Sequence, residues 1–115
     1  MDNEAALFKV LSDSTRLRLA VLLALRGETC VCDLATALDA PDFKISRHLS
    51  IMRASGMVEA RREGTWMHYR LVEGRTGLET CLHACFRDCF DDHPTVCEDL
   101  ARLAARACRK EKSCV

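Results

Sequence analysis

The chain has 115 residues, of which 49% are hydrophobic and 30% charged, and its formal net charge is zero. These values are typical of one globular domain whose core closes without metal or disulfide bonds. They exclude a membrane-spanning helix, which needs a run of about 18 apolar residues, and the N-terminus lacks the basic and apolar regions of a signal peptide. We therefore expect a single domain over residues 1–115, in the cytoplasm, with no membrane partner.

Eight cysteines are present, which is a high number for a chain of this length. In a reducing cytoplasm such thiols stay free, so they indicate metal binding or redox chemistry instead of a disulfide framework.

The first half of the chain predicts four helices. Apolar residues predict a short helix over about 4–11, and Ser12–Thr15 supplies side-chain oxygens that can cap the next helix. An almost continuous apolar run over 16–25 predicts a buried central helix that ends at Gly27. An extended piece over 29–31 precedes a helix over about 32–38.

The fourth helix, over about 42–54, has two distinct faces. Pro41 suits the first position of a helix, where its missing N–H is not needed. Ile45, His48, Leu49 and Met52 recur at the spacing of a buried stripe. The two helices and their turn form a helix-turn-helix over about 32–55.

The pattern after the helix-turn-helix changes to that of strands. Residues 57–72 alternate around Glu63-Gly64, which predicts a β-hairpin wing. Apolar stripes return over about 78–110, interrupted at Pro94, and such stripes in so small a chain need a partner surface. The predicted fold is mainly α (α+β): a winged helix-turn-helix with a two-stranded wing and N- and C-terminal dimerisation helices, about 4–11 and 78–110.

A helix-turn-helix places its second helix in the major groove of DNA. Residues 41–75 carry seven basic and four acidic side chains, which fits local contact with phosphates. The predicted DNA-binding residues are Lys44, Ser46, Arg47, Ser50, Arg61 and Arg62. Arg47 suits a guanine and Lys44 a phosphate. A solvated helix face is the alternative for these side chains. We expect His48, Trp66 and Tyr69 to be packing residues.

Cys30 and Cys32 are separated by one residue, at the start of a predicted helix. Thiolates are soft ligands that select thiophilic ions, and a helix N-terminus favours the thiolate form. The alternative is a pair of small buried apolar side chains.

Four segments in this order resemble the arsenic-repressor (ArsR/SmtB) family, the arsenite-sensing branch in particular. They are residues 11–17, 28–34, 44–49 and 64–71. The resemblance implies a homodimeric repressor that binds an inverted-repeat operator in double-stranded DNA. It also implies a metalloid-resistance operon and release when As(III) or Sb(III) binds Cys30 and Cys32, with no permanent cofactor.

One position departs from the family pattern, because Ala35 stands where a third cysteine often lies. A third sulfur then has to come from elsewhere in the dimer or from a small cytosolic thiol. The candidates in the chain are Cys81, Cys85, Cys89, Cys108 and Cys114. The three thiols on the predicted helix from 78 also fit a second thiolate site or the edge of a dimer-facing core.

Other functions remain open on the same fold. The effector could be cadmium, lead, monovalent copper or an organoarsenical, or the thiols could sense redox state. A zinc site at His83 and His93 lacks the expected partner residues, so we expect both histidines on the surface. An enzyme is not expected, because Cys-x-Cys is not the Cys-x-x-Cys of thiol oxidoreductases and no βαβ pattern surrounds it.

Overall fold

The computed structural model describes the backbone of residues 1–113 and the side chains of residues 1–106. Its elements, in chain order, are α1 (Asp2–Leu11), α2 (Ser14–Arg26), β1 (Thr29–Cys30), α3 (Val31–Leu38), α4 (Asp42–Ala54), β2 (Val58–Glu63), β3 (Trp66–Leu71), α5 (Gly77–Cys89) and α6 (Pro94–Ser113). This order confirms the predicted winged helix-turn-helix. In the described part of the chain, no helix is both long and apolar enough to span a bilayer.

Helix α2 lies at the centre of the core, as its apolar run predicts. Asp13 caps it by accepting hydrogen bonds from the backbone N–H groups of Thr15 and Arg16, at 2.9 and 3.1 Å. Gly27 ends it with a positive φ of 75°, which glycine adopts without strain. Five consecutive residues are buried between these ends: Leu19, Ala20, Val21, Leu22 and Leu23.

The cap at Asp13 has a measurable effect on stability. Burial acts to raise the pKa of Asp13, but hydrogen bonds and charge from Arg16, with His48 and Thr15 adding, hold it below its usual range. Asp13→Ala should lower the free energy of unfolding by ~1 kcal/mol at neutral pH. The stabilisation is present above the unfolded-state pKa and is lost as pH falls through the lower folded-state pKa. Urea denaturation of wild type and Asp13→Ala, at pH 7 and in acid, should show that their difference in free energy of unfolding is smaller in acid. A larger difference in acid would contradict this prediction.

Helices α3 and α4 form the helix-turn-helix. The turn between them passes through Asp39, whose φ of 53° is in the left-handed region. Pro41 is the N-cap of α4 and not its first helical residue, so that prediction was wrong by one position. The physical reason is that Pro41 keeps an extended ψ of 147° while its carbonyl accepts the first helical hydrogen bonds, from Lys44 and Ile45. Ile45, Leu49 and Met52 are buried as predicted.

The predicted extended piece over 29–31 forms a third strand of the sheet, which the sequence did not join to the hairpin. Strands β2 and β3 form the predicted hairpin, which turns at Gly64 with a φ of 62°. Strand β1 joins the other edge of β3, so the strand order is β1-β3-β2 and the sheet has three strands. Tyr69 is buried as predicted. Trp66 is 50% exposed, which corrects its prediction as a packing residue: it lies next to the hairpin turn, beyond the core.

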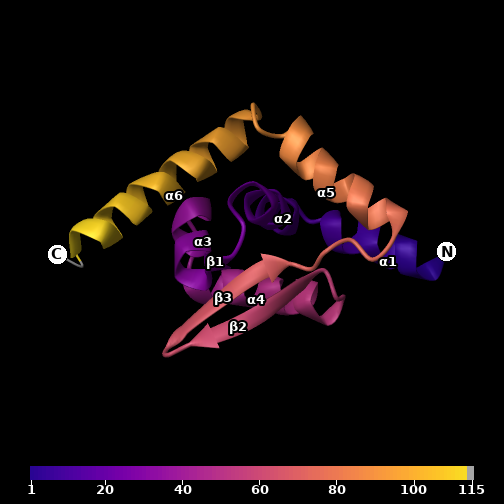
Figure 1. Ribbon diagram of the computed structural model, residues 1–115, viewed down its shortest axis with the longest axis horizontal. Coiled ribbons are helices and arrows are strands. Elements are labelled where there is room, and N and C mark those ends of the chain that lie inside the picture. The colour runs from indigo at the N-terminus through magenta and orange to yellow at the C-terminus, as the bar shows by residue number, and fades with distance from the viewer. Residues whose placement is uncertain (114–115) are drawn as a thin grey trace.

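Helices α5 and α6 form a bent arm over the rest of the domain (Figure 1). Helix α5 packs on α2, and α6 packs on α3 and α2. His93 lies at the bend, where its Nδ1 accepts a hydrogen bond from the backbone N–H of Thr95. Arg18 of α2 and Arg102 of α6 both donate to Asp99, which is fully buried, and Arg102 also donates to the Ala37 carbonyl. This network joins the arm to α2 and α3.

Candidate effector site and DNA-binding surface

The two thiols of the Cys-Val-Cys segment lie in contact. The sulfurs of Cys30 and Cys32 are 3.0 Å apart. Cys30 ends strand β1 and is the N-cap of α3, and Cys32 lies in the first turn of that helix. The change from an extended to a helical backbone at Cys30 brings residues i and i+2 to the same side. Cys30 is buried and Cys32 is half-buried, so a small ion can reach the pair through Cys32. This geometry suits a thiophilic ion bound by two sulfurs.

Helix α6 approaches this pair with a positive charge. The Nε of Arg106 lies 3.1 Å from Asp33 Oδ1. The hydrogen bond to Asp33, with Cys32 adding a second, raises the pKa of Arg106. The C-terminal helix is therefore attached to the start of α3, beside the thiols.

Among the described side chains, no third cysteine lies beside this pair to complete a metal site. Ala35 is buried one turn further along α3. The side chains of Cys108 and Cys114 lie outside the described residues. Among the side chains that are described, no three His, Cys, Asp or Glu residues are arranged to hold a metal ion.

The three cysteines of α5 lie on a different part of the fold, because α5 and α3 lie on opposite sides of α2 (Figure 1). Cys81 and Cys89 are exposed and Cys85 is half-buried. A hydrogen bond with Cys85, together with the nearby charges of Asp88 and Asp91, raises the pKa of Cys89. That shift favours the thiol over the thiolate that metals need.

The two histidines of the arm, His83 and His93, have structural roles in the helices that carry them. His93 is exposed and caps α6, as described above. His83 is half-buried, which corrects the expected surface position, and burial lowers its pKa. Its ring packs near Phe86.

The predicted DNA-binding residues lie on the outer face of α4 and on the wing. Lys44, Arg47 and Ser50 are exposed and Ser46 is half-buried. His48 faces inward, with its Nδ1 3.3 Å from Arg16 and 4.0 Å from Asp13. It is therefore a packing residue, as predicted. Arg61 and Arg62 are exposed on β2.

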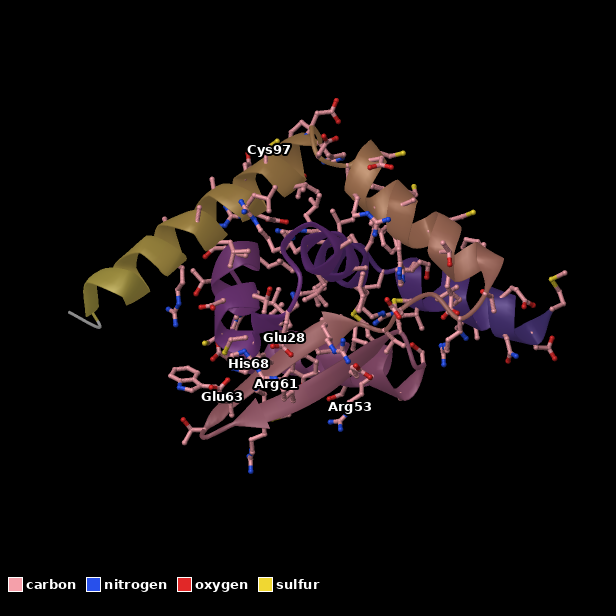
Figure 2. The ribbon with its side chains drawn as sticks, in the orientation of Figure 1. Glu28, Arg53, Arg61, Glu63, His68 and Cys97 are labelled. Atoms are coloured by element: carbon pink, nitrogen blue, oxygen red, sulfur yellow. The ribbon has the colours of Figure 1, made fainter. Side chains whose placement is uncertain are left out.

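An ion pair that sequence reasoning missed joins the wing to the segment before β1. Arg61 bonds Glu28 through both carboxylate oxygens, at 2.8 and 3.2 Å. This contact holds the pKa of Glu28 below its usual range and raises that of Arg61. Arg61 also lies 3.2 Å from Glu63, and Glu63 lies 3.6 Å from His68 (Figure 2). No local pattern predicts a pair of residues 33 positions apart.

Residues 13–60 match the family model described as "Bacterial regulatory protein, arsR family". The chain is 57% identical over 65 residues to the "Arsenical resistance operon repressor" of Escherichia coli (strain K12), which covers 56% of each chain. It is 37% identical over 78 residues to the protein of the same name from Bacillus subtilis (strain 168), covering 64% of this chain and 74% of the relative. The chain belongs to the arsR family.

A solved structure agrees with this assignment. The homodimeric winged helix-turn-helix DNA-binding domain of a possible ArsR-family regulator from Mycobacterium bovis has a TM-score of 0.63 and 35% identity, covering 80% of this chain and 82% of that one. The matched family is described as one of bacterial regulatory proteins and not of thiol oxidoreductases. The chain spans about half the length of several curated relatives that it matches.

Proposed function

We propose that this arsR-family chain represses a metalloid-resistance operon and leaves its operator when As(III) or Sb(III) binds the thiolates of Cys30 and Cys32. The observation that carries the proposal is the 3.0 Å separation of these two sulfurs, at the junction of β1 and α3. No permanent cofactor is needed. The protein would work in the cytoplasm, where the operator is found.

DNA binding would use a homodimer, the state described for the Mycobacterium bovis neighbour. Two recognition helices, α4 of each subunit, would then enter successive major grooves about one helical turn (~34 Å) apart, so the operator would be an inverted repeat. The exposed face of α4 would supply the contacts of Lys44, Ser46, Arg47 and Ser50. Arg61 and Arg62 would add positive charge on the wing, where the DNA backbone or minor groove passes.

Release follows from where the thiols lie. An ion bound by both sulfurs has to enter between atoms that are 3.0 Å apart, so the β1–α3 junction adjusts, and α3 packs directly on α4. Strand β1 is also paired with β3 of the wing. An adjusted junction therefore disturbs both DNA-contacting elements, and effector and DNA oppose each other by linkage. A coupling of ~1–3 kcal/mol weakens operator binding by ~5–150-fold.

Replacing both thiols tests this directly. We expect Cys30→Ser/Cys32→Ser to bind the operator as wild type does, but to stay bound in arsenite, because hydroxyls do not replace soft thiolate ligands. The measurement is fluorescence anisotropy of a labelled duplex from upstream of the resistance operon, titrated with protein in the presence and absence of arsenite.

Cys97→Ser is the matched control. Cys97 is exposed near the α5–α6 bend, on the opposite side of the molecule from Arg61 and His68 of the wing (Figure 2), and its loss should leave release unchanged. Parallel titrations with Cd²⁺, Pb²⁺, monovalent copper and peroxide separate the other effectors. Release of the double serine variant by arsenite would reject the assignment of Cys30 and Cys32.

A further inference from the structure

Three residues that pair directly across the sheet form a row from the effector site to the wing. Cys30 of β1 pairs with His68 of β3, and His68 pairs in turn with Arg61 of β2. Residues paired in this way point to the same face of a sheet. Exposure rises along the row, because Cys30 is buried, His68 is half-buried and Arg61 is exposed. The candidate effector ligand is thus two strands away from an arginine of the wing.

The ion pair between Glu28 and Arg61 connects the two ends of this row. Glu28 precedes β1 by one residue, and Arg61 lies on the opposite edge strand. The pair therefore spans the central strand β3 and ties both edges of the sheet together (Figure 2). It is bidentate, with Arg61 Nε 3.2 Å from Oε1 and an outer guanidinium nitrogen 2.8 Å from Oε2.

The backbone connection between β1 and the wing is short. Strand β1 has two residues, and its ladder with β3 has two residue pairs. The side-chain bridge from Glu28 adds a connection between the start of β1 and β2 that the backbone ladder does not make. The guanidinium of Arg61 is also shared between Glu28 and Glu63, which leaves less of its charge to attract a phosphate. Its surroundings suit a residue that positions the wing.

We propose that Glu28 and Arg61 form a positioning pair that transmits effector binding at Cys30 to the wing. The inference rests on the proposed function and adds the route by which it operates. When an ion binds between the sulfurs of Cys30 and Cys32, which lie 3.0 Å apart, the β1–α3 junction adjusts and the backbone that carries Glu28 shifts. The ion pair carries that shift across β3 to β2. Without the ion pair, the effector still binds, but the wing shifts less when it does.

The size of the effect follows from the exposure of the pair. The side chains of Arg61 and Glu28 are 53% and 32% exposed. Exposed ion pairs of this kind correspond to a ~1.4- to ~5-fold change in an equilibrium constant. The measured quantity is the release factor, defined as the operator dissociation constant in saturating arsenite divided by that in its absence.

The test is a double-mutant cycle on the release factor. Glu28→Gln and Arg61→Gln should each lower it by up to ~5-fold, and the double variant should lower it no further, because both remove the same interaction. The charge swap Glu28→Arg/Arg61→Glu should restore part of the loss. Effects of the two substitutions that simply add, or a Glu28→Gln variant with the wild-type release factor, would overturn the proposal.

The wing offers a matched control. Glu59 of β2 and Arg70 of β3 form an ion pair of similar exposure that does not reach β1. Glu59→Gln should therefore leave the release factor at the wild-type value. If it lowers the factor as much as Glu28→Gln does, any loss of charge on the wing has that effect, and the inference fails.

A measurement without DNA completes the test. Trp66, the single tryptophan of the chain, begins β3 next to the hairpin turn and reports on the wing. Arsenite should change its emission in wild type and change it less in Glu28→Gln, at equal arsenite occupancy. A wild-type protein that arsenite does not release would reject the proposed function together with this inference. A wild type that is released, with a Glu28→Gln variant released equally well, would reject the inference alone.

Discussion

Replacing Asp99 by alanine is expected to lower the free energy of unfolding by ~3–5 kcal/mol, which is a large share of the ~5–15 kcal/mol typical of a domain. Asp99 has no solvent exposure and accepts hydrogen bonds from Arg18, at 2.7 and 3.0 Å, and from Arg102, at 2.8 Å. Its removal leaves two partly buried guanidinium groups facing each other without a carboxylate between them. The contact that joins α6 to α2 then becomes repulsive.

Urea denaturation followed by circular dichroism measures this change. Glu98→Ala is the matched control, because Glu98 is the exposed neighbour on the same helix and its loss should change stability by less than ~0.5 kcal/mol. Equal midpoints for the two variants would show that the buried network does not stabilise the fold. Since Arg102 also donates to Ala37 of α3, we further expect Asp99→Ala to loosen the packing of α6 on the helix that carries Cys32.

Arg47→Ala is expected to weaken operator binding by ~5–150-fold, which corresponds to ~1–3 kcal/mol for a bidentate contact with a guanine. Arg47 is exposed in the N-terminal half of α4, the part of a recognition helix that lies nearest the base edges. Under the proposed contact with a base, its loss should also relax the sequence preference at one position of each half-site. Anisotropy titrations against the operator and single-base variants measure both effects.

Lys44→Ala provides the comparison for a phosphate contact. It should weaken binding to all duplexes by a similar factor and reduce the slope of log K against log salt by about 1. An Arg47→Ala variant that weakens every duplex equally, as Lys44→Ala does, would show that Arg47 contacts the backbone and not a base.

The elements that could be predicted from sequence are those whose signals are local. The apolar run of α2, with its cap at Asp13 and its stop at Gly27, needs no information from distant residues. The same holds for the stripe of α4, where Ile45 and Leu49 are buried as their spacing predicts. The Cys30–Cys32 contact is local too, since two residues at a strand-to-helix junction determine it.

The features that could not be predicted depend on contacts between distant parts of the chain. An extended piece was predicted at β1, but its pairing with β3 was not, because a strand of two residues is too short for an alternating pattern. Arg106 reaches Asp33 across 73 positions. Trp66 was wrongly predicted to be a packing residue, because an aromatic residue in a strand pattern does not show how far the hairpin extends beyond the core. The role of each arginine on the wing likewise depends on which carboxylate the fold brings to it.

The pairing of Cys30 with His68 has a consequence for transplanting the proposed effector site into another winged helix-turn-helix protein. The proposed ligand Cys30 is part of a sheet, so α3 with Cys30 and Cys32 cannot be transplanted alone. In a recipient winged helix-turn-helix, the strand that corresponds to β3 must have an unpaired edge that can accept β1 in the same register. The unit to transplant is the segment from Glu28 to Leu38 together with the two residues of β3 that receive it, His68 and Tyr69.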